Sequence, residues 1–193
     1  VESRGLGDVY KRQIQNMVIS LSNVLVQVSV NGYGAAAMAG FAAYMKVDGF
    51  NILPVLSFSM AATTFVGQNL GAGQIERTKR GARFGTITSV ILAELIGVAV
   101  FIFAPQLIAA FDTSPDVIAY GVDKARTSVL FYCLLAFSHA MASILRGAGK
   151  AVVPMFVMMI CWCIIRVSFL AIAVPLTGSI QMVYWVYPLT WFL

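Results

Sequence analysis

Long apolar runs separated by short polar segments make up most of this chain. A helix needs about 20 mainly apolar residues to cross a bilayer, since these rise roughly 30 Å at 1.5 Å each. Six stretches fit this description, at residues 14–32, 51–70, 84–104, 126–145, 152–174 and from Ile180 onward. The pattern therefore predicts an all-α membrane fold, a polytopic six-helix bundle whose last helix is truncated.

Polar positions recur at helical spacing along the first predicted span. Five hydrogen-bonding side chains follow one another at steps of three or four: Asn16, Ser20, Asn23, Gln27 and Asn31. This spacing places all five on one helix face. An unsatisfied polar group in lipid costs of order a few kcal/mol, so the line must face protein or water.

Two further spans carry similar polar lines. In the second span the line is Asn51, Pro54, Ser57, Ala61, Thr64 and Gln68, and in the fourth it is Ser128, Tyr132, His139, Ser143 and Arg146. Three such helices predict a water-filled cavity between them. Small polar residues also let membrane helices pack closely. We favour that interpretation for the Ser and Thr positions, and the cavity for Asn23, Gln27 and Gln68.

Three ionisable side chains lie deep in predicted spans, where such groups are costly and usually functional. Glu94 and Arg166 are candidates to pair or to touch a substrate, and Glu94 is also a candidate protonation site. The alternatives are a neutral packing role for Glu94, and snorkelling or a structural hydrogen-bond clamp for Arg166. His139 is more typical of a donor between helices than of a proton relay. The predicted substrate or ion pathway comprises Asn23, Gln27, Gln68, Glu94, Tyr132, His139 and Arg166.

The charged residues cluster between the spans and predict an orientation. Residues 74–83 hold four basic residues against one acid, residues 105–124 hold three aspartates, and residues 146–150 are basic again. By the positive-inside rule, loops 74–83 and 146–150 are cytoplasmic, in a multi-pass protein of the inner (plasma) membrane. The segment with Lys46 and Asp48 and the turn at 175–178 are then predicted to be external loops.

The segment 112–116, DTSPD, predicts the start of a helix. Thr113 or Ser114 can cap it, Pro115 suits the first helical position, and Asp116 complements the helix dipole.

Composition supports a membrane protein and excludes several functions. The chain is 60% hydrophobic and 11% charged with a mean hydropathy of +0.85, whereas soluble domains are about 25% charged. Its net charge of +5 fits loops beside anionic lipid rather than nucleic acid. The three cysteines lie in apolar runs and indicate neither a disulfide framework nor a metal site.

We expect the chain to be a fragment, because it starts at Val1 and stops at Leu193 within an apolar run. Residues 1–13 carry five charges and end abruptly at Ile14, so we predict a linker or non-native tail outside the first helix. Residues 14–193 are predicted to form one transmembrane domain.

The segment GFNILPVLSFSMAATTFVGQNLGAGQIERTKRG resembles the start of the second lobe of multidrug and toxic compound extrusion (MATE) transporters. SILRGAGKAVVPM, IIRVSFL and WVYPLTWFL are similar to later segments of that lobe. The resemblance assigns turn motifs to Gly67, Gln68, Asn69, Gly71 and Gly73, and to Arg146, Gly147 and Gly149.

The resemblance implies a twelve-helix secondary antiporter of two lobes. It would export cationic or amphipathic drugs and metabolites in exchange for H⁺ or Na⁺, with no other cofactor. This chain would supply the C-terminal lobe, helices seven to eleven and part of twelve. Its partners would be the lipid bilayer, an N-terminal lobe of the same chain and a small cationic substrate.

One departure from the family concerns ion coupling. Some members place coupling carboxylates in the seventh and tenth helices, but residues 14–32 and 126–145 contain no Asp or Glu. The coupling acid is then expected in the N-terminal lobe, or at Glu94. Flipping of a lipid-linked precursor is the alternative function. An intramembrane enzyme is disfavoured, because paired Asp, GxSxG and HExxH motifs are absent from the sequence.

Overall fold

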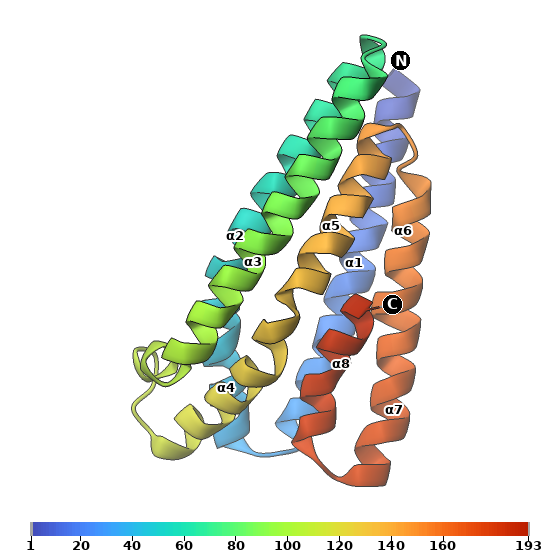
Figure 1. Ribbon diagram of the computed structural model, residues 1–193. Helices are drawn as coiled ribbons and strands as arrows, with labels where there is room; N and C mark the ends of the chain where they lie inside the picture. Colours follow the sequence, from blue (N-terminus) through green and yellow to red (C-terminus); the bar gives the residue numbers. More distant parts are fainter. Residues whose placement is uncertain (1, 193) are drawn as a thin grey trace.

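A computed structural model describes residues 2–192, which form helices joined by short turns (Figure 1). The long helices at the start are α1 (Glu2–Asn31), α2 (Ala35–Gly71) and α3 (Ile75–Ala109). They are followed by α4 (Pro115–Ser128), the 3₁₀ segment η1 (Val129–Phe131), α5 (Tyr132–Gly147), α6 (Val152–Met159), the π-helical segment η2 (Ile160–Ile165), α7 (Arg166–Thr177) and α8 (Ile180–Phe192). No strand occurs within residues 2–192.

The helices form six rods, which confirms the predicted all-α bundle. Segments α4, η1 and α5 follow one another as one broken rod, and α6, η2 and α7 form another. Within the described residues, four rods are long and apolar enough to cross a membrane: Ala35–Gly71, Ile75–Ala109, Pro115–Gly147 and Val152–Thr177. The remaining rods are α1 and α8.

The helices extend well beyond the predicted spans, so several predicted loops were wrong. Lys46 and Asp48 lie inside the first half of α2, because the alanine-rich segment before them is helical. The basic cluster of residues 77–83 lies in the first turns of α3, and α3 continues through Pro105. Helix α1 already begins at Glu2, so the predicted boundary at Ile14 is not a helix end. Pro175 lies inside α7, but the predicted turn does occur at its end, where Gly178 has a φ of 61°.

Helix α4 starts where DTSPD predicted it. Pro115 is its first residue and Ser114 occupies the cap position. The Ser114 side chain makes no capping hydrogen bond. Instead, the Asp112 carboxylate accepts a 2.8 Å hydrogen bond from the Ser114 amide, and this bond lowers the pKa of Asp112.

The two turns at the basic end share one sequence and one geometry. Gly71-Ala72-Gly73 ends α2, and Gly147-Ala148-Gly149 ends α5. In each, the last glycine has a positive φ, of 70° or 80°. Gln74 N donates to Asn69 O, and Lys150 N donates to Leu145 O, as in a Schellman motif. Glycine is required at the left-handed positions because it has no Cβ.

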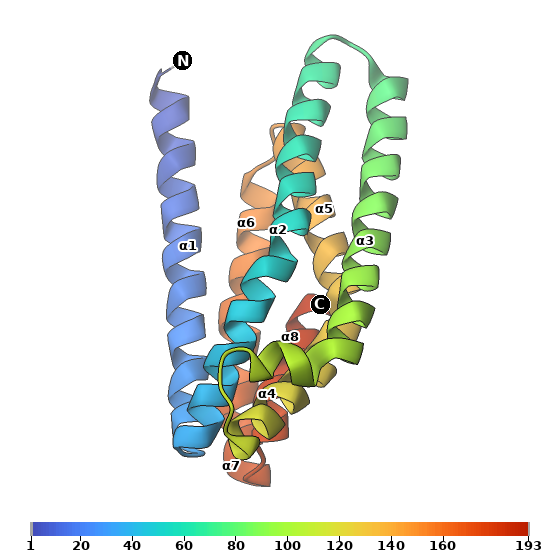
Figure 2. The ribbon, with the colours of Figure 1, turned by 90° about the vertical axis from the view of Figure 1, so that its left-hand side faces the viewer.

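Two apolar clusters hold the bundle together. One joins α2, α3, α4 and α5, and the other joins α1, α2, α7 and α8. Figures 1 and 2 show the α2–α3 hairpin on one side of the bundle and α1 with α6 and α7 on the other. Helices α2 and α4 pack tightly at Gly40, where an added Cβ would lie 2.7 Å from the Val117 carbonyl oxygen.

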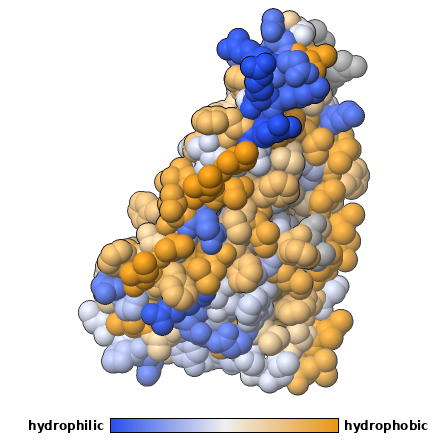
Figure 3. Space-filling model, in the orientation of Figure 1, coloured by the Kyte–Doolittle hydropathy of each residue, from blue (hydrophilic) through white to orange (hydrophobic). Residues whose placement is uncertain are grey.

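The outer surface is apolar along most of the bundle, and polar atoms gather near the tip of the α2–α3 hairpin (Figure 3). Six exposed apolar side chains recur along α3 at steps of three or four: Phe84, Ile87, Ile91, Leu95, Val98 and Ile102. A soluble protein rarely exposes such a continuous apolar stripe. This face of α3 is suited to lipid.

Candidate functional site

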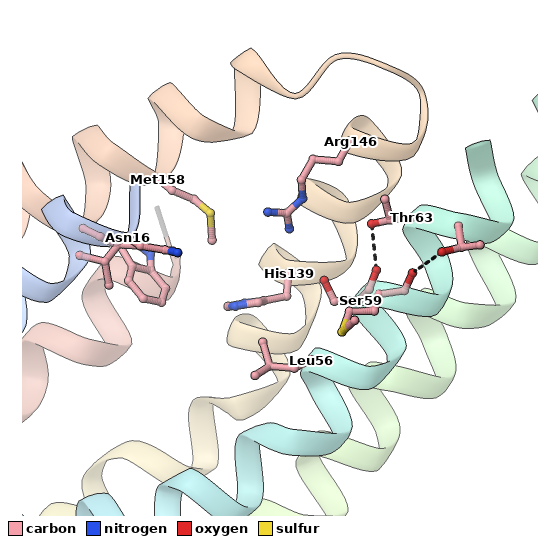
Figure 4. A pocket seen from close by; sticks show the side chains of 11 residues that line it. Asn16, Leu56, Ser59, Thr63, His139, Arg146 and Met158 are labelled. Carbon is pink, nitrogen blue, oxygen red and sulfur yellow. Dashed lines mark hydrogen bonds between the residues drawn. The ribbon is translucent and has the colours of Figure 1, made fainter. Parts of the chain in front are cut away.

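A cavity of about 510 Å³ lies in the half of the bundle nearer the basic end (Figure 4). Helices α1, α2 and α5 and the α6–η2 rod line it. Its polar lining consists of Asn16, Ser59, Thr63, Thr64, His139 and Arg146. Leu56, Met60, Met158 and Trp162 contribute much of the apolar lining. A mixed wall of this kind can accommodate an amphipathic molecule.

Hydrogen bonds of hydroxyl groups link α2 to α5 at the wall of the cavity. Ser59 Oγ and Ser143 Oγ form a short hydrogen bond, and Thr63 Oγ1 donates to Ser59 O and Ser143 O at 3.0 and 3.3 Å. Sequence reasoning missed Ser59 and Thr63, because the predicted polar line followed the neighbouring face of α2. On that line, Ser57 and Thr64 donate to carbonyl groups of their own helix.

His139 and Arg146 project into the cavity from the same face of α5 (Figure 4). The His139 Nδ1 atom lies 3.0 Å from Leu135 O, and its ring lies 6.1 Å from the Trp162 ring. The contact with a backbone carbonyl requires a proton on Nδ1, so in the neutral ring Nε2 is the acceptor. His139 is thus one predicted pathway residue that lines the cavity.

Arg166 is buried at the junction of α1, α7 and α8 instead of facing this cavity. Its side chain is 1% exposed, and its Nη atoms donate to Asn23 Oδ1 at 3.0 Å and Thr190 Oγ1 at 3.2 Å. The guanidinium also lies over the rings of Trp162 and Tyr187, at 5.1 and 4.7 Å from their centroids. These contacts clamp three helices together, which agrees with the hydrogen-bond clamp predicted as one alternative for Arg166 and contradicts snorkelling.

Glu94 does not pair with Arg166. Its Oε2 atom accepts a 3.1 Å hydrogen bond from the Cys133 amide, just after the η1 segment interrupts the helix. At the same break, Gly97 packs so closely that an added Cβ would lie 2.4 Å from Val129 O. Glu94 therefore satisfies a backbone donor beside the helix break, where an unpaired group is costly in a membrane.

The other predicted pathway residues are dispersed. Gln27 donates to Asn31 on its own helix at 3.0 Å, and Gln68 is exposed near the end of α2. Tyr132 is buried, and its hydroxyl hydrogen-bonds to Asp48. The structure thus brings Asn23 to Arg166 and places His139 in the cavity, but it does not gather the seven residues into one site.

Sequence reasoning also missed a second polar cluster, in the half of the bundle away from the basic end. Asp48, Lys124, Tyr44 and Tyr132 meet between α2, α4 and α5. The sequence predicts Asp48 in an external loop and Lys124 in the acidic segment 105–124, although each has a polar neighbour four residues away, Tyr44 and Ser128. That spacing is the signal that identifies their helix faces.

The residues that the structure describes hold no group of three or more His, Cys, Asp or Glu side chains able to bind a metal. Cys133, Cys161 and Cys163 are free thiols.

Comparison with known proteins identifies the family. The family model described as MatE matches residues 13–172. The probable multidrug resistance protein YpnP of Bacillus subtilis is 28% identical over 159 residues, which cover 82% of this chain and 36% of YpnP. The probable multidrug resistance protein NorM of Thermotoga maritima is 30% identical over 144 residues, covering 75% of this chain and 31% of NorM. This chain thus spans about a third of each relative.

The fold agrees with solved structures. The MATE transporter ClbM in complex with Rb⁺ superimposes with a TM-score of 0.88 over 97% of this chain and 44% of ClbM, at 23% identity. A MOP-superfamily transporter from Pyrococcus furiosus gives a TM-score of 0.84 over 94% of this chain and 40% of that protein, at 18% identity. The match of a family model to most of the chain shows that it belongs to the MatE family of membrane transporters, which are not enzymes.

Proposed function

We propose that this chain forms one lobe of a longer antiporter. The whole protein would export amphipathic organic cations in exchange for H⁺ or Na⁺ by alternating access. The observation that carries this proposal is the cavity of about 510 Å³, lined by four rods of a bundle that exposes many large apolar side chains. Substrate sites in transporters with internal repeats lie between lobes, near the middle of the bilayer. The names of YpnP and NorM support multidrug export.

The basic end of the lobe is proposed to face the cytoplasm. Arg77, Lys79, Arg80 and Arg83 lie together in the first turns of α3, and Arg146 and Lys150 flank the neighbouring turn. Positive residues at the ends of membrane helices favour the cytoplasmic side. The cavity would then open toward the cytoplasm, in a protein of the plasma membrane, with an N-terminal lobe on its other side.

An anionic metabolite is the second candidate substrate. Arg146 is the charged residue among the cavity-lining residues, and the lining includes no Asp or Glu. The FAD transporter of Shewanella oneidensis is 25% identical over 107 residues, which cover 55% of this chain and 24% of that protein. Flipping of a lipid-linked precursor has less support, because one arginine does not make a broad basic cavity.

Filling the cavity tests the proposed function. The complete gene is expressed in a drug-sensitive host, and efflux of a fluorescent organic cation is measured at matched expression. Thr64→Trp places a large ring in the cavity and is expected to lower export at least about tenfold, since binding requires the space it fills. Ile91→Trp, on the exposed face of α3, is the matched control and should export normally.

Equal export by Thr64→Trp and Ile91→Trp would exclude this cavity from the pathway. Export of a flavin nucleotide, with no export of the cation, would favour the second candidate.

A further inference from the structure

An apolar groove lies between α3 and α5, in the half of the bundle nearer the basic end. It has a volume of about 250 Å³ and is lined by Ala82, Arg83, Thr86 and Ile87 of α3 and by Met141 and Ile144 of α5. The Thr86 hydroxyl donates a 2.8 Å hydrogen bond to Ala82 O within its own helix. The groove thus offers apolar contacts over most of its lining, together with the guanidinium group of Arg83.

The groove and the cavity described above lie on opposite faces of α5. His139 and Arg146 line the cavity, whereas Met141 and Ile144 line the groove. At 3.6 residues per turn, Met141 and Ile144 lie about 200° and 140° around the helix from His139. A molecule bound in the groove is therefore separate from a substrate bound in the cavity.

Arg83 lies where the basic first turns of α3 meet its apolar face. Arg80 precedes it by three residues, a spacing that places both guanidinium groups on one side of the helix. Both side chains are exposed, and neither makes an ion pair or hydrogen bond with another described residue. By contrast, Lys79 pairs with Glu76 at 2.9 Å, and Arg77 lies over a phenylalanine ring of α2. Arg80 and Arg83 thus leave two positive charges for an anion at the groove.

Charge and apolar lining together fit an anionic phospholipid better than a soluble anion. A guanidinium group binds phosphate oxygens through paired N–H donors, and basic pockets between membrane helices bind lipid head groups. Ile87 and Met141 lie farther from the basic end than Arg83, in the direction of the bilayer interior. An acyl chain gains free energy for each CH₂ group that it buries against such side chains, whereas a soluble phosphate does not. Figure 3 shows the same change from hydrophilic to hydrophobic surface below the tip of the α2–α3 hairpin.

We propose that this groove is a binding site for an anionic phospholipid. Its phosphate group accepts hydrogen bonds from Arg83 and Arg80, and one acyl chain lies against Ala82, Ile87 and Met141. The bound lipid bridges α3 and α5 on the face of α5 that is remote from the cavity. Lipid binding requires neither antiport nor an organic substrate, so it stands or fails independently of the proposed function.

Photocrosslinking of the full-length protein in bilayers tests the site. Phosphatidylglycerol with a photoreactive group on one acyl chain is compared with phosphatidylcholine that carries the same group, and labelled peptides are identified by mass spectrometry. We expect phosphatidylglycerol to label residues 82–87 and 141–144 at least about fivefold more than phosphatidylcholine, because the basic residues attract its net negative charge. Equal labelling of these residues by the two lipids would overturn the proposal.

Arg83→Gln tests the contact with the phosphate group. Loss of hydrogen bonds to a charged group should lower labelling of the groove by phosphatidylglycerol at least about tenfold. Arg77→Gln is the matched control, since it removes the same charge from the same helix but lies over Phe65 of α2. At physiological ionic strength it should change the labelling by no more than about twofold, because salt screens distant exposed charges. An equal loss in both variants would show general attraction to the membrane surface and would overturn the site.

Ala82→Phe tests the apolar part of the groove without a change of charge. The larger side chain fills space that the acyl chain needs, so labelling should fall, whereas Ile102→Phe on the exposed face of α3 should label like the wild type. Undiminished labelling in Ala82→Phe would overturn the proposed position of the acyl chain.

An excess of glycerol phosphate distinguishes a lipid head group from a soluble phosphate. We expect it to leave the labelling by phosphatidylglycerol unchanged, since it cannot occupy the apolar lining. Displacement of the lipid by glycerol phosphate would show that the groove selects a soluble anion, and the lipid site would be refuted.

Discussion

Replacing Gly147 with alanine tests how tightly α2 and α5 pack beside the cavity. An added Cβ would lie 2.6 Å from Thr63 O and 2.8 Å from Val66 Cβ. Both neighbours belong to the backbone or to the root of a β-branched side chain, so they cannot move aside by a change of rotamer. Helices α2 and α5 would have to separate by several tenths of an ångström.

The expected loss of stability follows from two opposing terms. Overpacking a tight contact costs about 1–3 kcal/mol. Alanine in place of glycine stabilises a helix interior by roughly 0.5–1 kcal/mol, and stabilises the last turn by less. With a gain of about 0.5 kcal/mol in the last turn, the net destabilisation of Gly147→Ala is about 0.5–2.5 kcal/mol. Gly85→Ala is the matched control, because Gly85 lies inside α3 with nothing within 4 Å of an added Cβ. It should gain about 0.5 kcal/mol or remain unchanged.

The measurement is equilibrium unfolding of the full-length protein in mixed detergent micelles, followed by tryptophan fluorescence. Gly147→Ala should unfold at a lower denaturant fraction than the wild type, and Gly85→Ala at an equal or higher one. Identical midpoints for the two variants would show that the α2–α5 contact is not close-packed, and the reasoning would be refuted.

Three further outcomes are expected. Arg166→Lys should lower stability by about 1–3 kcal/mol in the same unfolding assay, because an ammonium cannot reproduce the two-armed contact of the guanidinium. Glu94→Gln keeps an acceptor for the Cys133 amide and should unfold like the wild type, whereas Glu94→Leu should lose about 1–3 kcal/mol; equal loss in both would contradict the capping role. The Ser114 amide lowers the pKa of Asp112 below its ordinary value of 3.8. The Asp112 carboxylate therefore stabilises this helix end fully above pH 3.8, and the stabilisation is lost as the pH falls below that value. Amide hydrogen exchange around Ser114 measures this pH dependence. The Asp112→Asn variant should not show it.

The membrane class, the approximate spans and the start of α4 could be predicted from the sequence. These features depend on local rules: apolar length, charge between spans, and the fixed φ of Pro115. The ends of the helices could not be predicted in this way. The apolar runs mark what lies in lipid, whereas α2 also continues through Lys46 and Asp48, where the helix remains hydrogen-bonded.

The polar lines were predicted on the right helices but only partly with the right partners. The cavity was the favoured prediction for Asn23, whereas its side chain accepts a hydrogen bond from Arg166, which lies 143 residues away in the sequence. Glu94 and Arg166 both lie deep in their spans, but Glu94 accepts from the Cys133 amide and Arg166 donates to Thr190.

The sequence by itself determined that this chain is a helical membrane lobe, since spans, turns and charge asymmetry follow from neighbouring residues. Only the tertiary structure decided which polar groups meet: Ser59 with Ser143, Glu94 with Cys133, and Asp48 with Tyr132. The physical reason is that helical periodicity assigns a residue to a face, while the rotation and crossing of packed helices determine what that face contacts.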